Sequence, residues 1–317
     1  MLSTYILLYK TLLPRRYRKY LQRAEGNIDM CHEALLHGTF YEEYAAYGFA
    51  TKNEAERRTY LTDAVRDKIC RRVNSRQGNH IVTNKYATYC QLRQFYHRKV
   101  WLLNGKTNLD EIIRVGIDRG QLVAKPADKC GGRGVELLTA TSKEEWHHLL
   151  SNKQGWIIEE CIQQVPVMAQ WNPSSVNTIR MNTFCHKDSI QVFTAFIRTG
   201  RKGSFVDNGL QGGLFASIDT VSGVIFTDGY DERCIAHAVH PDSSVPYKGT
   251  VIPRWDAAVA LAKEMALAMP GMTYIGWDLA LTTDGWEPVE ANRGEFIAQQ
   301  ITQGHGLRKE FEQACGL

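Results

Sequence analysis

The residues best suited to chemistry are a lysine and a glycine-rich turn that follows it. Lys125 and Pro126 precede residues 129–134, which contain Gly131, Gly132 and Gly134. Glycine lets the backbone approach an anion, and its N–H groups can then donate to phosphate oxygens. The order is neither a Walker loop nor a dinucleotide fingerprint, because the turn joins two expected strands. The sequence therefore indicates a phosphate-binding loop, with a plain hairpin as the alternative.

Oxygen-bearing side chains form a second group near the end of the chain. Glu290 and Asn292 fall on one face of an expected strand, because side chains alternate along strands. The Asp284-Gly285 pair predicts a hairpin that brings Asp278 beside them. Two carboxylates and an amide oxygen suit Mg²⁺ that also keeps phosphate oxygens and water. The alternative is the polar outer face of a hairpin.

Two arginines form a third group in the middle of the chain. Arg180 and Arg198 lie in expected strands among apolar neighbours, and Asp207-Asn208 follows them. Guanidinium groups can neutralise a phosphoryl group during its transfer or hold a carboxylate through two hydrogen bonds. Apolar surroundings favour a site over a solvated surface, whereas Asp207-Asn208 could be a simple turn.

The surrounding sequence predicts the elements that must position these groups. Residues 27–72 have a helical pattern, and short β-rich runs separated by glycine begin after Gly78. Ser142 and Glu145 form a capping box that predicts a helix start, and a long helix is expected over residues 254–269. The expected strands cover residues 121–125, 135–138, 156–162, 178–185, 190–198, 214–219, 224–227, 273–281 and 286–292.

Composition limits the class of protein. With 317 residues, 44% hydrophobic and 23% charged, the chain is expected to be globular. The apolar run Tyr5–Leu8 is far shorter than a membrane span and is followed by basic residues, so we expect a cytoplasmic location. The basic residues before Gly26 are expected to form a solvated helix face, with contact at the inner face of a membrane as the alternative.

Other partners are limited by the same composition. The eight cysteines are scattered, which predicts reduced thiols without a zinc site or a disulfide framework. The net charge of +4 comes with no recognised nucleic-acid-binding module, so no nucleic-acid partner is expected. The oligomeric state has no signature in the sequence.

From about Asn84 to Gln300 these features together resemble the ATP-grasp ligases, and within them the sugar-transfer-associated ATP-grasp proteins. The likeness rests on the order of the three groups and on the 12 positions between Asp278 and Glu290, a spacing similar to that of the glutamate-adding ligases. The stretches specific to this group are residues 175–180, 207–213, 240–241 and 276–278.

The resemblance implies an α+β fold of the ATP-grasp type, in which two αβ lobes sandwich ATP, with a helical N-terminal extension. The implied regions are a helical N-terminal cap over residues 1–78, a small αβ lobe with the glycine-rich loop over residues 79–165, and a large β-rich lobe with the metal site over residues 166–317.

The resemblance also implies site residues and cofactors. ATP and Mg²⁺, or Mn²⁺ as an alternative, are the implied cofactors. The implied ATP-binding residues are Lys85, Lys125, Gly131, Gly132, Gly134, Glu159, Glu160 and Ile162; the metal ligands are Asp278, Glu290 and Asn292; and the catalytic residues are Arg180, Arg198 and Asn208. Two positions depart from the family pattern. Asn84 stands where aspartate commonly precedes the first lysine, and Arg293 stands where many amino-acid ligases have a small residue.

The function implied by the resemblance is an ATP- and Mg²⁺-dependent carboxylate–amine ligase that acts through an acyl-phosphate and produces ADP. Its expected partners are a small-molecule or sugar-acid carboxylate and an amine acceptor, in the biosynthesis of surface or capsular polysaccharide or a related sugar conjugate. Two alternatives remain open: a kinase of this fold that phosphorylates a sugar or lipid acceptor, and a non-catalytic nucleotide-binding protein. A peripheral contact with a membrane or with polysaccharide machinery is a further expectation.

Overall fold

The computed structural model describes residues 27–128, 134–186, 189–207 and 212–317, and its tertiary contacts divide the chain into two compact units. The first unit comprises Met1–Arg72 and Glu295–Leu317, and the second comprises Val73–Gly294. The end of the chain therefore belongs with its beginning. The boundaries of the three regions expected from the sequence remain a prediction.

The first unit is helical over its described residues, as the sequence predicts for residues 27–72. Tyr47, Phe49 and Tyr60 pack together, and the Gln300 side chain accepts a hydrogen bond from Leu61 N at 2.8 Å. Its elements are α3 (Ile28–His37), α4 (Tyr41–Ala46), the 3₁₀ helix η1 (Phe49–Thr51), α5 (Glu54–Thr59), α6 (Asp63–Val73), α13 (Ile297–Gln303) and α14 (Arg308–Ala314).

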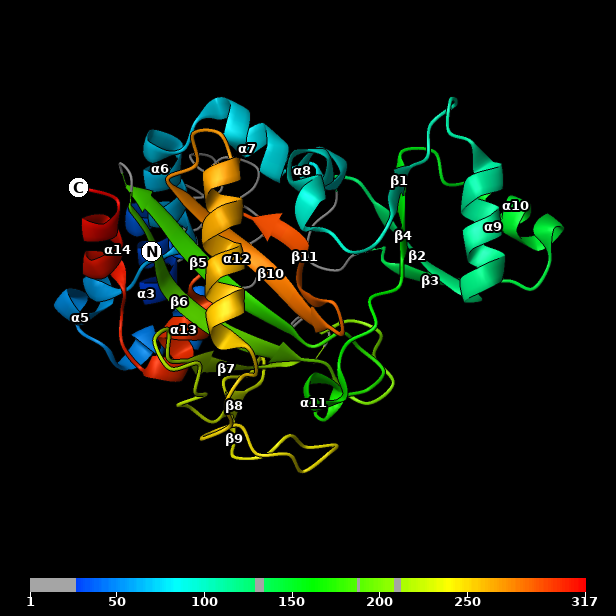
Figure 1. Cartoon of the computed structure of the whole chain (residues 1–317). Helices are drawn as coiled ribbons and strands as arrows, with labels where there is room; N and C mark the ends of the chain where they lie inside the picture. Colours follow the sequence, from blue (N-terminus) through cyan, green and yellow to red (C-terminus); the bar gives the residue numbers. More distant parts are fainter. Residues whose placement is uncertain (1–26, 129–133, 187–188, 208–211) are drawn as a thin grey trace. The chain divides into compact units, whose positions relative to one another are not determined.

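The second unit contains a four-stranded antiparallel sheet with strand order β1-β4-β2-β3. Helices α9 and α10 pack beside this sheet, where Ile112, Leu122, Trp146 and Ile158 form its core (Figure 1). The predicted capping box is confirmed, because Ser142 caps α10 together with Glu145. The elements are β1 (Val100–Leu102), α9 (Leu109–Arg119), β2 (Gln121–Pro126), β3 (Glu136–Thr139), α10 (Lys143–Ser151) and β4 (Trp156–Glu160).

A seven-stranded antiparallel sheet forms the rest of the second unit, with strand order β11-β10-β5-β6-β7-β8-β9. Helix α12 lies across one face of the sheet, as Figure 1 shows, and its Ala262 and Met265 share a core with Met181 and Trp277. The elements are α11 (Pro166–Ala169), β5 (Thr178–His186), β6 (Ser189–Thr199), β7 (Leu214–Ile218), β8 (Gly229–Tyr230), β9 (Ala236–His237), α12 (Trp255–Ala268), β10 (Tyr274–Thr282) and β11 (Gly285–Asn292).

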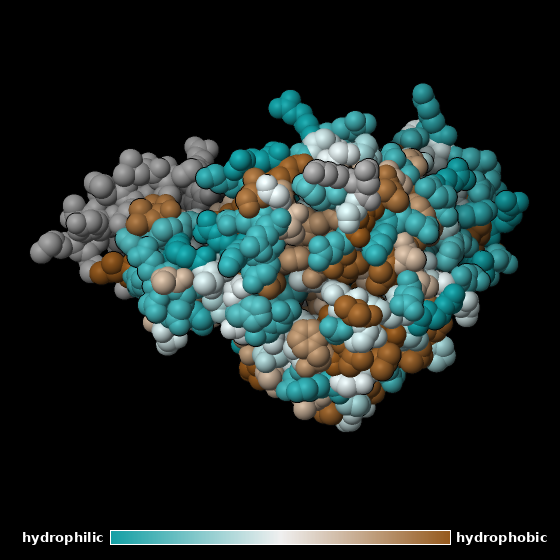
Figure 2. Space-filling view, turned by 60° about the vertical axis from the view of Figure 1, so that its left-hand side comes forward, coloured by the Kyte–Doolittle hydropathy of each residue, from teal (hydrophilic) through white to brown (hydrophobic). Residues whose placement is uncertain are grey.

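The strand expected over residues 224–227 does not form. Val224 and Ile225 make isolated bridges to Val251 and Ile218, because this segment divides its backbone bonds between β7 and the chain before α12. The chain between β7 and α12 also exposes Val221, Ile235, Val239 and Val251. Brown side chains gather in the lower part of Figure 2, the level at which Figure 1 shows β8 and β9.

Three short helices precede β1 in the second unit: α7 (Arg76–Val82), α8 (Lys85–Leu92) and the 3₁₀ helix η2 (Arg93–Phe95). Among the described residues no helix is both long enough and apolar enough to cross a membrane.

Candidate active site

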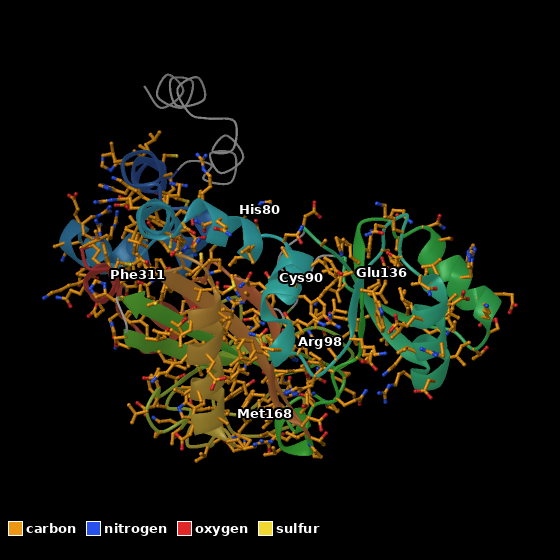
Figure 3. All side chains as sticks on the ribbon, turned by 45° about the horizontal axis from the view of Figure 1, so that its top comes forward. His80, Cys90, Arg98, Glu136, Met168 and Phe311 are labelled. Carbon is orange, nitrogen blue, oxygen red and sulfur yellow. The ribbon has the colours of Figure 1, made fainter. Side chains whose placement is uncertain are left out.

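Helix α8 presents Lys85 at its first position. The Asn84 side chain caps the helix by accepting a hydrogen bond from Ala87 N at 2.9 Å, and asparagine and aspartate cap helices about equally well. This capping role explains how asparagine can stand where aspartate is common. The Lys85 ammonium pairs with Glu290 Oε1 at 2.9 Å. In Figure 3, α8 is marked by Cys90, and the chain continues from it to Arg98.

The four-stranded sheet supplies a second lysine–glutamate pair. In the register of β2 and β4, Lys125 lies opposite Ile157, so Glu159 is its diagonal neighbour on the same face. The Lys125 ammonium forms an ion pair with Glu159, and Arg98 Nε donates to the same carboxylate at 3.0 Å. Burial acts to raise the pKa of Glu159, but the charges of Lys125 and Arg98 outweigh it and hold that pKa below its usual value.

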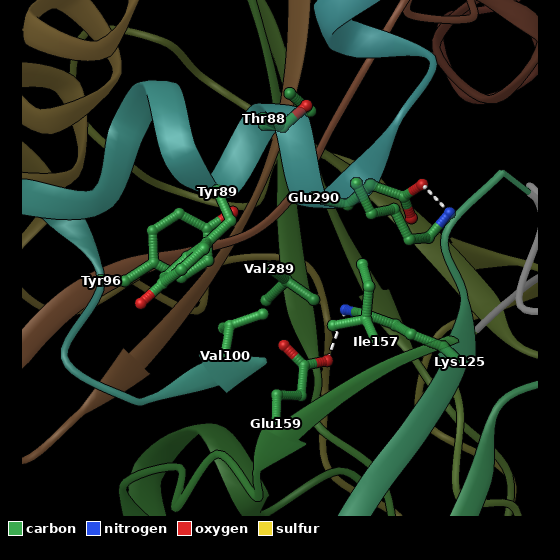
Figure 4. A pocket seen from close by; sticks show the side chains of 11 residues that line it. Thr88, Tyr89, Tyr96, Val100, Lys125, Ile157, Glu159, Val289 and Glu290 are labelled. Carbon is green, nitrogen blue, oxygen red and sulfur yellow. Dashed lines mark ion pairs between the residues drawn. The ribbon is translucent and has the colours of Figure 1, made fainter. Parts of the chain in front are cut away.

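These two pairs line one pocket, shown in Figure 4. The space, including its open mouth, measures about 290 Å³. In Figure 4, Tyr89 and Tyr96 lie on one side and Glu290 on the other. The pocket therefore offers an aromatic wall for a ring and ammonium groups for anions. It is lined by Lys85, Thr88, Tyr89, Tyr96, Val100, Lys125, Ile157, Glu159, Val289, Glu290 and Ala291.

The predicted hairpin of β10 and β11 is confirmed, and it brings Asp278 opposite Glu290. Between Asp278 and the next residue the register shifts, so Val289 has no partner across the strands. Such a bulge locally redirects side chains, and it commonly occurs at sheet edges. β11 is an edge strand, and Pro288, which has no N–H to donate, is tolerated there.

The arginines lie on the sheet face that α12 does not cover, next to this carboxylate pair. Arg180 holds Asp278 with two hydrogen bonds, the one from Nη2 measuring 2.9 Å. Arg198 Nη2 lies 2.9 Å from the same Asp278 carboxylate. Burial acts to raise the pKa of Asp278, but the two arginines outweigh it and keep that pKa below its usual value.

Asp207 completes this cluster from the other side of Arg198. Its carboxylate accepts hydrogen bonds from the backbone N–H and the hydroxyl of Thr178, and it lies 3.5 Å from Arg198 Nε. Here burial prevails and raises the pKa of Asp207, although Arg198 and Thr178 act against it. The cluster thus contains two buried carboxylates with opposite pKa shifts.

The sheet face is tightly filled beside Asp278. Asn182, Gly276 and Asn292 are register neighbours across β5, β10 and β11. A Cβ atom on Gly276 would lie 2.6 Å from Asn292 Oδ1 and 2.8 Å from Asn182 Oδ1. Glycine is required here because both amide groups occupy the space above its Cα.

The described part of the chain brings most of the predicted site residues into two neighbouring groups. The residues that line the pocket are Lys85, Lys125, Glu159 and Glu290. The residues on the sheet face are Arg180, Arg198, Asp278 and Asn292. The Glu160 side chain instead accepts from Lys99 N and Arg119, and Ile162 does not line the pocket.

The glycine loop is described only at its end. Gly134 adopts φ +77°, a conformation that favours glycine. Gly131, Gly132 and Asn208 lie outside the described residues.

Three residues of the pocket region were not predicted as site residues. Tyr89 and Tyr96 line the pocket, and Arg98 joins Glu159 to Glu287. The run His97-Arg98-Lys99 looks like a solvated basic surface, so no local signal points to the burial of Arg98.

The side chains that could bind a metal ion are the oxygen donors on the sheet face beside the arginines. Asp278 and Glu290 are adjacent, and Asn292 Oδ1 accepts a hydrogen bond from Gly294 N at 2.7 Å. Carboxylate and amide oxygens are suitable Mg²⁺ ligands when phosphates and water complete the shell. Across the described residues, no three His, Cys, Asp or Glu side chains could hold a metal ion together. A metal ion bound by Asp278 and Glu290 would therefore need the amide oxygen of Asn292 as its third protein ligand.

The solved structures to which the chain is similar include a ligase, a synthase and a synthetase. The L-amino acid ligase from Bacillus licheniformis is 13% identical, with a TM-score of 0.42 over 72% of this chain and 45% of that one. N5-carboxyaminoimidazole synthase from Aspergillus clavatus is 11% identical, with a TM-score of 0.47 over 81% of this chain and 58% of that one. D-alanyl-alanine synthetase A from Vibrio cholerae is 10% identical, with a TM-score of 0.48 over 77% of this chain and 67% of that one.

The chain thus spans less than two thirds of the first two of these proteins. No curated protein matches the sequence. Residues 64–316, which include both sheets and all the described site residues, match the family described as sugar-transfer associated ATP-grasp. The chain therefore has the ATP-grasp fold and belongs to the sugar-transfer associated ATP-grasp family.

Proposed function

We propose that the protein is an ATP- and Mg²⁺-dependent ligase that joins a carboxylate to an amine through an acyl-phosphate. One observation carries the proposal: Glu290 lines the pocket, and its register partner Asp278 is held by both arginines. A single pair of carboxylates therefore connects a lysine-lined pocket to two guanidinium groups. That arrangement suits the transfer of a phosphoryl group from a nucleotide in the pocket to an acceptor on the sheet face.

In this proposal, residues of the chain bind and orient the reactants and none forms a covalent bond. Lys85 and Lys125 hold the phosphates, and Tyr89 and Tyr96 lie on the side of the pocket where a base can stack. When bound through Asp278, Glu290 and Asn292, magnesium would neutralise part of the phosphate charge.

Arg180 and Arg198 stabilise the phosphoryl group during transfer and later the oxyanion formed when the amine attacks. Rate enhancement then comes from positioning and electrostatics.

The substrate class that we propose is a sugar-acid or other small carboxylate together with an amine, in the biosynthesis of surface polysaccharide or a related sugar conjugate. The family's association with sugar transfer supports this choice.

The test is ADP release by the purified protein with a panel of sugar acids and amines. A ligase produces ADP only when both are present, and an ¹⁸O-labelled carboxylate transfers one ¹⁸O atom to the released phosphate. If ADP forms without an amine and the phosphate stays on the acceptor, the protein is a kinase. ADP binding without turnover for any pair would instead support a non-catalytic nucleotide-binding protein.

A variant checks the role of the central pair of carboxylates. Glu290→Gln should lose ADP release while it still binds ADP, because the pocket keeps both lysines. Turnover equal to that of the wild type would contradict the assignment of Glu290.

A further inference from the structure

Arg98 connects the two sheets of the second unit at the wall of the pocket. Its side chain is 4% exposed. Nε donates to Glu159 on β4 at 3.0 Å, while Nη1 donates to Glu287 at 2.7 Å and to Pro288 O at 2.9 Å, both on β11. The guanidinium also lies 4.8 Å from the ring centre of Tyr96, which lines the pocket. Figure 3 shows Arg98 between the part of the chain that carries Cys90 and the smaller sheet.

The charges around Arg98 alternate in sign. Lys125 pairs with Glu159, Glu159 with Arg98, and Arg98 with Glu287. Arg98, Glu159, Glu287 and Lys125 are all buried. A buried carboxylate that loses all of its cationic partners is strongly destabilised. Within the described ranges Glu159 has two such partners, Arg98 and Lys125, and of these two Lys125 lines the pocket.

We propose that Arg98 is a positioning residue that lets Lys125 leave Glu159 for a nucleotide phosphate. When the Lys125 ammonium turns to the phosphate, Arg98 still neutralises Glu159, so no buried charge is left unpaired. Without Arg98, Lys125 would be the only cation beside Glu159 among the residues that the structure describes, and it would be held there. This inference rests on the proposed role of the pocket in binding a nucleotide.

The test measures the affinity for ADP with Mg²⁺ by calorimetry, with neither carboxylate nor amine present. Arg98→Met should weaken binding about tenfold or more, the effect expected when one partner of a buried charge pair is removed. Adding Glu159→Gln should restore most of that loss, because the uncompensated charge is then gone. The free energy of unfolding should remain low in the double variant, because Glu287 still lacks Arg98. A residue with only a structural role would not show this separation of affinity from stability.

Matched variants sharpen the test. Arg119 pairs with Glu160, the next residue of β4, but its side chain is 62% exposed, so Arg119→Met should leave ADP affinity unchanged. Arg98→Lys keeps a positive charge beside Glu159 but loses the guanidinium fork that also reaches Glu287, so it should recover part of the ADP affinity that Arg98→Met loses.

Several results would overturn the inference. The inference is contradicted if Arg98→Met binds ADP as tightly as the wild type, or if the double variant binds ADP no better than Arg98→Met. It is also contradicted if Arg98→Lys loses as much ADP affinity as Arg98→Met. If Arg98→Met does not fold, the double variant decides, because tenfold weaker binding than the wild type contradicts the proposal. A wild-type protein that binds ADP but ligates nothing refutes only the proposed ligase function. A wild type that binds no ADP refutes both proposals.

Discussion

The pocket and the neighbouring sheet face hold their charges in different ways. In the pocket, lysines pair with glutamates at the pocket lining. On the sheet face, arginines hold Asp278 with several bonds, and even the Cβ of an alanine at position 276 would meet its neighbours. In the pocket the charges are lysine–glutamate ion pairs, whereas on the sheet face a carboxylate is held by arginines through several hydrogen bonds.

This difference assigns separate tasks to the two regions. A lysine ammonium is a compact charge on a flexible stem, so it can exchange one anionic partner for another. A guanidinium fork fixes the geometry of the carboxylate that it binds. We infer that the pocket changes its pairing when a nucleotide enters, whereas the arginine face is already arranged before a ligand arrives.

The largest effect is expected from Asp278→Asn, which removes a buried charge shared by buried Arg180 and half-buried Arg198. Removing one partner of a buried ion pair costs about 3–5 kcal/mol, so the free energy of unfolding should fall by that order and ADP release should be lost. Urea unfolding followed by circular dichroism measures the change. In the control Asp242→Asn, the partner Arg201 is 40% exposed, and a loss of about 1 kcal/mol or less is expected. Equal losses in the two variants would remove the distinction between fixed and exposed pairs.

A smaller effect is expected from Gly276→Ala, which tests how tightly the sheet face is filled. The added Cβ would displace Asn182 or Asn292, and such overpacking costs about 1–3 kcal/mol. Thermal unfolding measures it, with Gly105→Ala as the control because nothing lies within 4 Å of that position. A Gly276→Ala protein as stable as the control would mean that the face can rearrange.

Lys85→Met should change stability even less, although it should impair binding. Its pair with Glu290 is partly exposed, so the free energy of unfolding should fall by less than about 1 kcal/mol. The affinity for ADP should nevertheless drop about tenfold, because a phosphate-binding charge is lost. Calorimetry measures the affinity, and Lys143→Met, which removes an exposed lysine of α10, serves as the control. A large stability loss with unchanged affinity would argue that Lys85 is structural.

The subtlest expectation concerns pH. The pKa of Asp278 is lowered by folding, so its stabilising contribution is present above the unfolded pKa of about 3.9 and is lost as the pH falls through the folded pKa. The pKa of Asp207 is raised, so its contribution is present at low pH and is lost as the pH rises through the folded pKa. Relative to the wild type, Asp278→Asn should therefore gain stability toward acid and Asp207→Asn toward neutral pH. Unfolding free energies measured from about pH 2 to pH 7 cover both trends, and parallel trends would contradict the assignment.

Local rules were enough to predict part of this site. Strand alternation and the Asp284-Gly285 turn placed Asp278, Glu290 and Asn292 together, because the two strands are adjacent in the sequence. The family resemblance then ordered the lysines and arginines around them.

Long-range contacts and irregular backbone were not predictable in this way. Arg98 meets Glu159 and Glu287, which are 61 and 189 positions away, and nothing in its own neighbourhood favours burial. The bulge at Val289 and the missing strand over residues 224–227 depend on which segments compete for backbone bonds in the folded sheet.

The bulge in β11 also affects how well the edge of the sheet could pair with another chain. An exposed edge strand with a regular row of free N–H and C=O groups can pair with another chain and start aggregation. In β11, Pro288 has no N–H, Val289 interrupts the repeat, and the Pro288 carbonyl is already bound by Arg98. The residues that shape the wall of the pocket thereby make this edge a poor template for a foreign strand.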